Sequence, residues 1–366
     1  MDDQDHCIVV GGDDDDDDDG GSSSAGSNDS TSYSSMMDLS KPTVNDKIRC
    51  VSYCPDGSIL ATGSDSHKIC LWVAKTSAPI VSLTGHTNSV LCIAFAPSVR
   101  DKVLVSGSED GTIKIWRIAD DVTKSHLEKT YADISMHEVC AIAYSPDGKR
   151  LASGSNDRIS LRMWDTYDAT GKVRYLPGIT SAPSDHVAAV AFSLPNHRIP
   201  RLNPATDPDS LLACGISNGC VKVINPLTGA VIHQLNLTNY VTSLVFSPDA
   251  RFLVAGCGDG NAHVWTLFPT LQPHSSLLPA TTKTLAAHVR PVLGVAYAPN
   301  GKLIATASAD NTIRVWDADD DCRLISTLTS KGSRVLCVAF SPDSASLAAG
   351  SDKWHIQQWR DIQKKK

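Results

Sequence analysis

The stretch Pro291–Trp316, which decides the fold, reads PVLGVAYAPNGKLIATASADNTIRVW. Its apolar runs, PVLGVAYAP, IATAS and TIRVW, are separated by turn-forming residues such as Asn300 and Gly301. Short runs of this kind, rich in β-branched residues and bounded by turn signals, predict antiparallel strands joined by hairpins. Residues 89–116 repeat the pattern as SVLCIAFAP, LVSGSED and TIKIW.

The same unit occurs seven times along the chain. Its third run closes on an anchor residue, which is Trp in six copies and Ile in the fourth: Trp72, Trp116, Trp164, Ile224, Trp265, Trp316 and Trp359. The gaps between these anchors are 44, 48, 60, 41, 51 and 43 residues. A period of about 40 to 50 residues indicates a repeat architecture rather than separate domains. The widest gap holds the proline-rich stretch 194–210, where we expect a long surface loop.

A fourth run follows each anchor, as in Ala78–Leu83 and Arg323–Leu328, so each unit predicts a four-stranded antiparallel sheet. One such sheet cannot bury both of its faces, but seven sheets in a closed ring bury one another. The sequence therefore predicts an all-β fold, a seven-bladed β-propeller of four-stranded antiparallel sheets.

Recurring motifs connect these units to a known family. The Gly-His pair, the Ser-Pro-Asp-Gly turn, the Ser-Gly-Ser-x-Asp segment and the final Trp together resemble the WD-repeat family over roughly residues 45–360. The resemblance implies a buried hydrogen-bonded set of four side chains per blade: a His before the first strand, a Ser or Thr in the second, an Asp in the next turn, and the Trp. Two units carry it in full: His86, Ser106, Asp110, Trp116 and His288, Thr306, Asp310, Trp316.

The other units depart from this set. The departures are Ser66 for the Asp in the first unit, a late His137 and an extra residue before Trp164 in the third, Asn218 and Ile224 in the fourth, Ala255 for the hydroxyl in the fifth, and Lys353 for the Asp in the seventh. We expect these blades to depend on apolar packing more than on polar networks and to be locally less stable.

A His, Ser and Asp in one unit also match the residue types of a hydrolase triad. In the family pattern, however, the hydroxyl is held by the indole inside the blade, so we expect no catalytic residue. We also expect no cofactor, because the turn Gly256–Gly260 lacks the helix that a dinucleotide site needs. The eleven cysteines lack the close C-x-x-C pairs of zinc sites, and the sequence predicts reduced core residues and no metal site.

The chain divides by composition into a tail, a body and a short end. Residues 1–35, with seven consecutive Asp, predict a disordered acidic tail. Residues 36–362 form the predicted propeller, and residues 363–366 are a basic end. Because the chain stops soon after Trp359, we expect the last blade to take its outer strand from about Met36–Val44, where Pro42 is acceptable on an edge strand.

The WD-repeat resemblance also implies a binding face, formed by the starts of the first strands and the turns after the second strands. We expect it to contain Lys47, Arg49, Leu91, Glu109, Tyr240, Leu293, Arg334, Leu336, Asp352 and Trp354. This face has an apolar centre of three leucines and a basic sector, Arg334, Lys47 and Arg49, that suits a peptide with an acidic element. Trp354 is either an exposed contact residue or packed flat on its own blade.

Charge is distributed unevenly. Residues 1–40 hold twelve of the 40 acidic residues and no Lys or Arg, which leaves 28 acidic against 33 basic residues in the remainder. The tail is either a solubilising segment or a contact for something basic, such as histones, another chain or the basic sector. The body is only mildly basic and 6% of the chain is aromatic, so direct nucleic-acid binding is not favoured.

No apolar run has the length of a signal-peptide core or a membrane span, so we expect a cytoplasmic or nuclear protein that is neither secreted nor membrane-bound. The favoured function is a non-catalytic scaffold or adaptor that binds protein or peptide partners. The alternatives are a substrate-recognition or chromatin/histone-binding subunit of a larger complex and, less favoured, a nucleic-acid-binding protein or an enzyme. No repeat ends in the Trp-Asp-x-Arg pattern that ubiquitin-ligase receptors of this kind often resemble.

Overall fold

The computed structural model describes residues 46–132, 137–157, 161–167, 171–176, 178–180, 182, 184–195, 210–267, 281–286, 288–330, 332–353 and 356–362. The predicted tail, the predicted closing strand, Trp354 and the basic end lie outside the described residues, as does most of the loop 194–210. None of the described helices is long and apolar enough to cross a membrane.

The described residues form twenty-seven strands in seven antiparallel sheets, which we number as blades 1 to 7 in chain order. Blades 1 to 3 consist of β1 (Ile48–Tyr53), β2 (Ile59–Ser64), β3 (Ile69–Val73) and β4 (Pro79–Leu83); β5 (Val90–Phe95), β6 (Val103–Ser108), β7 (Thr112–Arg117) and β8 (His126–Ala132), with the short 3-10 helix η1 (Val122–Lys124) before β8; and β9 (Val139–Tyr144), β10 (Arg150–Ser155), β11 (Leu161–Asp165) and β12 (Val173–Tyr175).

Blades 4 to 7 consist of β13 (Val187–Phe192), β14 (Leu212–Ile216), β15 (Cys220–Ile224) and β16 (Val231–Asn236); β17 (Val241–Phe246), β18 (Phe252–Cys257), β19 (Asn261–Thr266) and β20 (Thr281–Ala286); β21 (Val292–Tyr297), β22 (Leu303–Ser308), β23 (Thr312–Asp317) and β24 (Arg323–Thr329); and β25 (Val335–Phe340), β26 (Ser346–Ser351) and β27 (Ile356–Arg360). Six sheets have four strands, and blade 7 has three among the described residues.

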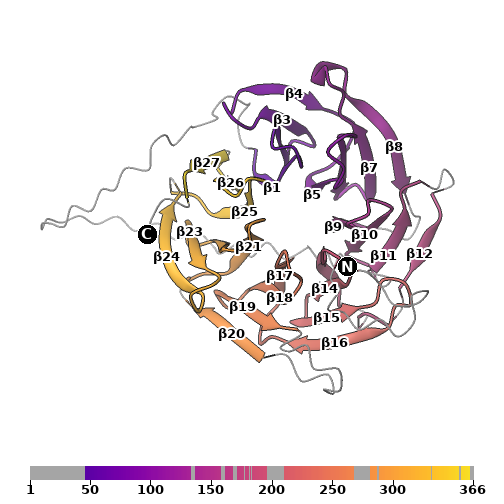
Figure 1. Ribbon diagram of the computed structural model, residues 1–366. Coiled ribbons are helices and arrows are strands. Elements are labelled where there is room, and N and C mark those ends of the chain that lie inside the picture. Colours follow the sequence, from indigo (N-terminus) through magenta and orange to yellow (C-terminus); the bar gives the residue numbers. More distant parts are fainter. Residues whose placement is uncertain are drawn as a thin grey trace, which may run out of the picture.

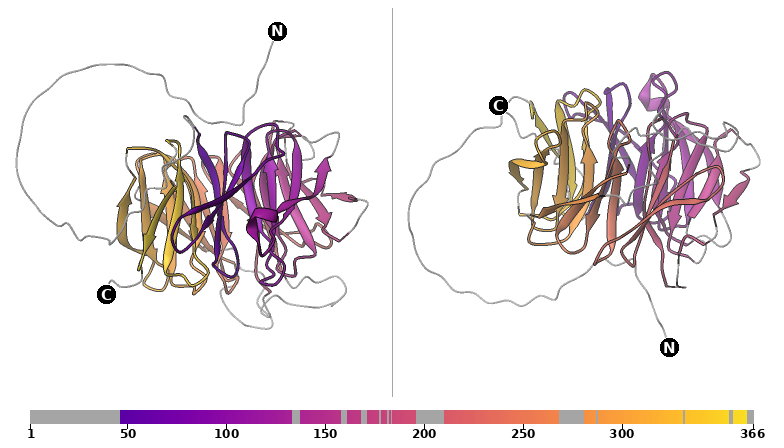
Figure 2. Two further views of the ribbon diagram at one scale, coloured as in Figure 1. Left: turned by 90° about the horizontal axis from the view of Figure 1, so that it is seen from above. Right: turned by 60° about the horizontal axis from the view of Figure 1, so that its bottom comes forward.

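The blades stand around a central axis, with the first strand of each blade innermost and the last strand at the rim (Figure 1). Side views show a single ring of upright sheets (Figure 2). β1 packs against both β5 and β25, so the ring is closed between blades 7 and 1. The predicted all-β, seven-bladed propeller is confirmed.

Neighbouring blades approach one another closely near the axis. At Gly107 in β6, an added Cβ would lie 2.5 Å from Cγ1 of Val139, in the first strand of blade 3. At Gly350 in β26, an added Cβ would lie 2.4 Å from Cγ2 of Ile48 in blade 1. A larger residue at either position would have to push two sheets apart. Glycine at this repeated position therefore reflects the packing distance between blades.

Seven apolar clusters fill the spaces between consecutive blades. Each cluster contains the third strand of one blade and the first two strands and the anchor of the next, as Leu71 of blade 1 packs with Phe95 and Trp116 of blade 2. The residue before the anchor belongs to this seam in six blades: Leu71, Ile115, Met163, Val223, Val264 and Val315. Blade 7 has Gln358 at this position.

Gln358 makes the closing seam polar. Its Oε1 accepts a hydrogen bond from Ser77 Oγ at 2.8 Å, and its Nε2 donates to Tyr53 Oη at 2.7 Å and to the carbonyl oxygen of Ala74 at 3.1 Å. Gln358 is 3% exposed. The ring is thus closed between the described residues of blades 7 and 1 by side-chain hydrogen bonds as well as by apolar contacts. The predicted closing strand from residues 36–44 stays a prediction.

Candidate functional site

The four-residue sets of blades 2 and 6 have the same geometry. His86 lies with Nδ1 2.8 Å from Asp110 Oδ2 and Nε2 2.7 Å from Ser106 Oγ, which also accepts a hydrogen bond from Trp116 Nε1 at 2.8 Å. In blade 6 the matching distances are 2.8 Å for His288–Asp310, 2.8 Å for His288–Thr306 and 3.0 Å for Trp316–Thr306. The structure therefore brings all eight predicted residues together as two sets.

Burial and hydrogen bonding shift the pKa values of Asp110 and His288. For Asp110, burial raises the pKa, but hydrogen bonds from His86 and Thr112 outweigh it and hold the pKa well below its usual range. Burial lowers the pKa of His288, which favours the neutral imidazole. The Ser106 hydroxyl is fully buried between an imidazole and an indole. These side chains hold together the loop, the second strand and the third strand, and Ser106 is not presented to a substrate.

Blades 1, 3 and 4 contain polar networks that the sequence did not lead us to expect. In blade 1, Asp46 takes the place of the missing His and accepts from Ser64 Oγ at 2.9 Å and from the backbone N–H of Ser66 at 2.7 Å. In blade 4, Asn218 Nδ2 donates to Asp185 Oδ2 at 2.9 Å. Blade 1 also keeps the bond from its anchor Trp to a second-strand hydroxyl.

Blade 3 differs most. Arg162, with no exposed surface, forms an ion pair with Asp157 at 2.8 Å and donates to Ser155 Oγ at 2.7 Å. His137 is exposed, so the arginine rather than the histidine meets the turn Asp. Blades 1, 3 and 4 therefore have polar networks of their own, because residues outside the family motif supply donors and acceptors. That the departing blades depend more on apolar packing than on polar networks and are locally less stable stays a prediction.

The described residues among those predicted for binding lie on one face of the ring, and Trp354 is outside the described residues. Backbone hydrogen bonds join the start of each first strand to the turn after the second, for example Asp65 N–H to the carbonyl of Lys47 and Asp352 N–H to that of Arg334. We call the face that carries these loops and turns the top face. The three predicted leucines, Leu91, Leu293 and Leu336, lie near the starts of the innermost strands β5, β21 and β25 and are half-buried.

The basic sector is smaller than the sequence suggests, because both arginines pair with acidic residues of their own blades. Arg49 donates from two nitrogens to the Asp65 carboxylate, at 2.6 and 3.1 Å. Arg334 Nε donates to Asp352 Oδ2 at 2.6 Å. Lys47 is half-buried, and no side-chain ion pair or hydrogen bond joins it to another described residue. The sequence placed Lys47, Arg49, Arg334 and Asp352 on one face but did not predict these ion pairs.

The remaining predicted residues have ordinary surroundings. The Tyr240 ring lies on Gly258, where an added Cβ would come within 2.4 Å of Cε1, and burial raises the pKa of its hydroxyl. Glu109 is half-buried in the turn after β6.

Among the described residues, one group of three has donor atoms close enough to hold a metal ion: Cys257, Asp259 and His263 in blade 5. The sequence did not predict this group.

Comparison with known proteins places these features in a family. A family model described as "WD domain, G-beta repeat" matches residues 39–73, 77–117, 128–165, 230–266, 280–317 and 322–360. Similar curated proteins include "B-type cell cycle switch protein ccs52A" of Medicago truncatula (28% identical, covering 79% of this chain and 54% of the relative), "WD repeat-containing protein slp1" of Schizosaccharomyces pombe (26%, 80% and 53%) and "Anaphase-promoting complex subunit cdc20" of Dictyostelium discoideum (28%, 80% and 53%).

The chain spans about half the length of these curated relatives. A solved structure with the same fold is the β-propeller domain of Cps50 (Swd1) from Myceliophteria thermophila, with a TM-score of 0.70 and 16% identity, covering 86% of this chain and 97% of that chain. The family model passes over blade 4, whose anchor is Ile224, although blade 4 is a complete sheet. With six matched repeats and a closed ring, the chain belongs to the WD-repeat β-propeller family.

Proposed function

We propose that this propeller is a non-catalytic adaptor that binds a peptide with an acidic element on its top face, with Arg334 as the main anion contact. The proposal rests on the exposure and the hydrogen bonding of the Arg334 side chain. Arg334 is 34% exposed, while its partner Asp352 is 12% exposed, so the ion pair orients the guanidinium from below. Within the described part of the chain, Nε donates to Asp352 and neither terminal nitrogen has a hydrogen-bond partner, so both can donate to a carboxylate.

Arg49 contributes less to this contact. Both of its bonded nitrogens are occupied by Asp65, and its side chain is 18% exposed. An incoming acidic group would have to displace a bidentate partner there. Around the channel mouth, the half-buried Leu91, Leu293 and Leu336 offer apolar contacts. The expected ligand is therefore a short peptide whose apolar residue enters the channel mouth and whose acidic residue meets Arg334.

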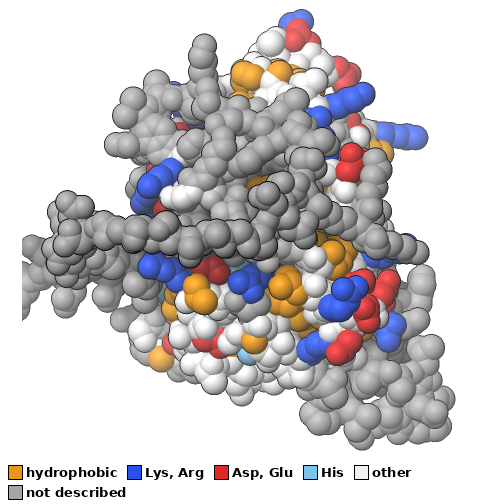
Figure 3. All heavy atoms as spheres, turned by 90° about the vertical axis from the view of Figure 1, so that its left-hand side faces the viewer, with side chains coloured by type: hydrophobic (Ala, Val, Ile, Leu, Met, Phe, Trp, Pro, Cys, Tyr) orange, Lys and Arg blue, Asp and Glu red, His pale blue; other side chains and the backbone are white. Residues whose placement is uncertain are grey.

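The side of the ring seen in Figure 3 is a less suitable docking area for an anionic polymer. On the side seen in Figure 3, the described Lys and Arg side chains are interspersed with Asp and Glu. A surface of mixed sign gives no continuous positive track for a phosphate backbone. The charge distribution supports protein or peptide partners over nucleic acid.

Affinity purification of the wild type and of Arg334→Glu, followed by mass spectrometry, tests this function. The matched control is Arg323→Glu, which makes the same charge change at an exposed arginine on β24 that pairs with Asp320 at 2.7 Å. We expect partners that are retained by wild type and Arg323→Glu and lost from Arg334→Glu. If Arg334→Glu and Arg323→Glu recover the partners equally well, the top face is not the binding surface.

A second candidate is a substrate-recognition subunit of a larger complex, and the relatives' names favour it. Proteins named as a subunit or cofactor of the anaphase-promoting complex match this chain at 28% identity over 274 to 299 residues. Size-exclusion chromatography of a cell extract distinguishes the two proposed functions. A subunit elutes far above the 39.0 kDa of the chain in a stoichiometric assembly, whereas an adaptor for peptides elutes in part as the monomer.

A further inference from the structure

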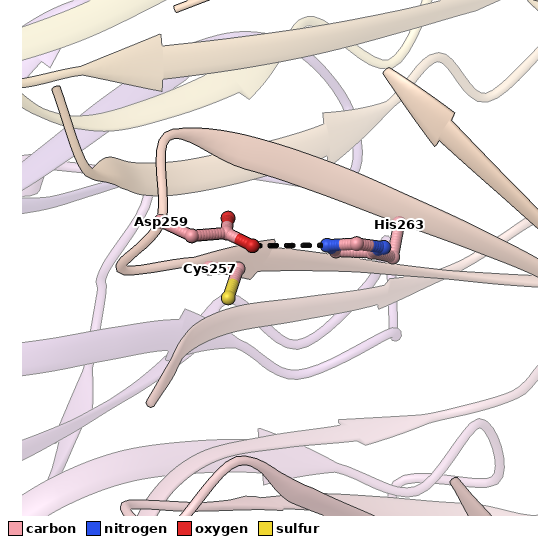
Figure 4. A group of neighbouring side chains, drawn as sticks. All are labelled: Cys257, Asp259 and His263. Atoms are coloured by element: carbon pink, nitrogen blue, oxygen red, sulfur yellow. Dashed lines mark ion pairs between the residues drawn. The ribbon is translucent and has the colours of Figure 1, made fainter. Parts of the chain in front are cut away.

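Blade 5 gathers three different metal-ligand types at the end of β18 and the start of β19. Figure 4 shows Cys257 at the end of β18, Asp259 in the turn, and His263 on β19, with the Asp259 and His263 side chains pointing toward each other. One ligand atom from each of these residues lies within 4.8 Å of the other two. The Cys257 residue is fully buried and Asp259 is exposed, so the group lies at the border of the core and solvent.

Two substitutions relative to the other blades create this group. Cys257 occupies the last position of the second strand, where blades 2 and 6 have Ser108 and Ser308. Each of those serines donates to a loop carbonyl, at 3.1 and 3.0 Å, and Cys257 Sγ donates to Asn239 O at 3.6 Å. His263 lies two residues before the anchor, where the other blades have Cys, Lys, Arg or Gln.

The His263 ring is held in place but its second nitrogen is not satisfied. Nδ1 is 3.4 Å from Thr284 Oγ1, and the ring stacks on Trp265 at 24°. Nε2 is buried with no hydrogen-bond partner among the described residues and lies 3.6 Å from Asp259 Oδ2, which is too long for a hydrogen bond. At the equivalent position of blade 3, the longer Arg162 side chain reaches Asp157 in the turn at 2.8 Å. An arginine at this position can therefore pair directly with the turn Asp, whereas the shorter His263 does not reach it.

The gap has the size that a tetrahedral ion needs. Zinc bonds of about 2.0 to 2.3 Å place neighbouring ligand atoms roughly 3.5 Å apart, close to the Asp259–His263 separation. A sulfur, an imidazole nitrogen and a carboxylate oxygen are ligands that zinc accepts, whereas magnesium and calcium prefer oxygen alone. Thr284 would orient the imidazole from outside the ligand set.

We propose that Cys257, Asp259 and His263 form a Zn²⁺ site on the top face of blade 5. The three side chains supply three ligands, and water takes the fourth position on the exposed Asp259 side. The ion links the end of β18 to β19, whereas the His–Asp pair of blades 2 and 6 links the loop before the first strand to the turn after the second. Blade 5 lacks a loop His and carries Ala255 at the hydroxyl position, and its loop reaches Asp259 through Thr238 Oγ1 at 3.3 Å instead.

Zinc titration of the full chain, after chelator treatment and with a chromophoric competitor, tests the site. We expect one zinc bound per chain, weakened by at least about 100-fold in Cys257→Ser and His263→Gln. Both variants are compatible with the fold, because blades 1, 2, 3, 6 and 7 have Ser at the first position and blade 7 has Gln at the second. Cobalt in place of zinc should give the thiolate charge-transfer and tetrahedral absorption bands in wild type.

The tail supplies the necessary control, because His6, Cys7 and the Asp run are themselves potential ligands. Cys7→Ser should keep the bound zinc and the cobalt spectrum. Equal zinc affinity in wild type, Cys257→Ser and His263→Gln would overturn the proposal. A thiolate band that disappears only in Cys7→Ser would overturn it as well, because the metal would then be held by the tail.

Discussion

Replacing Gln358 by Met is expected to weaken the closure of the ring more than the same replacement one residue earlier. Gln358 lies in the seam between blades 7 and 1. The other six blades have an apolar residue at the position that Gln358 occupies in blade 7. Its carboxamide makes three hydrogen bonds, to Ser77, Tyr53 and Ala74. Methionine has a similar length and volume, so the change removes the polar contacts with little loss of packing.

The magnitude follows from the groups that lose a partner. Ser77 is 2% exposed, Ala74 6% and Tyr53 8%, so water replaces the carboxamide poorly at any of them. A buried polar group left unpaired costs about 1 to 3 kcal/mol, and burying the methionine recovers about 1 kcal/mol. With partial relaxation of the three partners, we expect the free energy of unfolding to fall by about 3 kcal/mol.

Gln357 provides a matched control on the same strand. It is equally buried, at 3% exposed, but its Nε2 has no hydrogen-bond partner. Gln357→Met should therefore stay within about 1 kcal/mol of wild type. Urea denaturation followed by tryptophan fluorescence measures both variants. If the two free energies of unfolding differ by less than about 0.5 kcal/mol, the hydrogen bonds of Gln358 do not stabilise the seam and the reasoning fails.

Three further predictions concern other parts of the ring. Arg162→Met should lower the free energy of unfolding by about 3 to 5 kcal/mol, because the substitution leaves the Asp157 carboxylate buried without the Arg162 guanidinium. Urea denaturation measures this loss, and a loss below about 1 kcal/mol would contradict a buried ion pair. Burial lowers the pKa of His288, so the unfolded chain takes up this proton at a higher pH than the folded chain, and stability present above about pH 6.5 is lost as the pH falls toward 5. The difference in free energy of unfolding between wild type and His288→Gln should therefore narrow between about pH 7.5 and 5, and a constant difference would refute this. Deleting residues 1–45 should lower the melting temperature well below that of a chain lacking only residues 1–30, since β27 has a free outer edge among the described residues; equal melting temperatures would reject the N-terminal closing strand.

The sequence was sufficient for the ring because repeated spacing survives local divergence. Ile224 was identified as an anchor because it closes the third run of the fourth unit, and blade 4 is present although its residues match the family poorly. The two complete polar sets were predictable from the resemblance to the WD-repeat family: in both, the hydroxyl lies four residues before the turn Asp and the Trp six after it, while the His precedes the Asp by 24 residues in one set and 22 in the other. Motif and spacing therefore determine the number of blades and the hydrogen-bonded sets that follow the motif.

Polar partners outside the motif were not predictable from spacing alone. Arg162 and His263 occupy the position two residues before the anchor, where the side chain faces the turn after the second strand only once the hairpin is formed. Aligning the seven units at this position does show the signal, since it holds Cys70, Lys114, Arg162, Lys222, His263, Arg314 and Gln357. The ion pairs of Arg49 and Arg334 depend on side-chain directions across a loop, which no periodicity encodes.

Gln358 also bears on why the ring closes with seven blades. Adjacent blades are similar enough that blade 7 could in principle pack against the first strand of another copy of the unit. At the equivalent place in blade 2, however, Phe95 stands where blade 1 has Tyr53 and packs against the apolar Leu71. A carboxamide brought to that surface would be buried with no hydroxyl to accept its N–H, at a cost of about 1 to 3 kcal/mol. The six apolar seams hold neighbours together without distinguishing them, whereas Gln358 disfavours packing of blade 7 against a first strand that ends in Phe. Blades 3 and 6 end this strand in Tyr144 and Tyr297, so the carboxamide distinguishes blade 1 from the Phe-ending blades and not from these two.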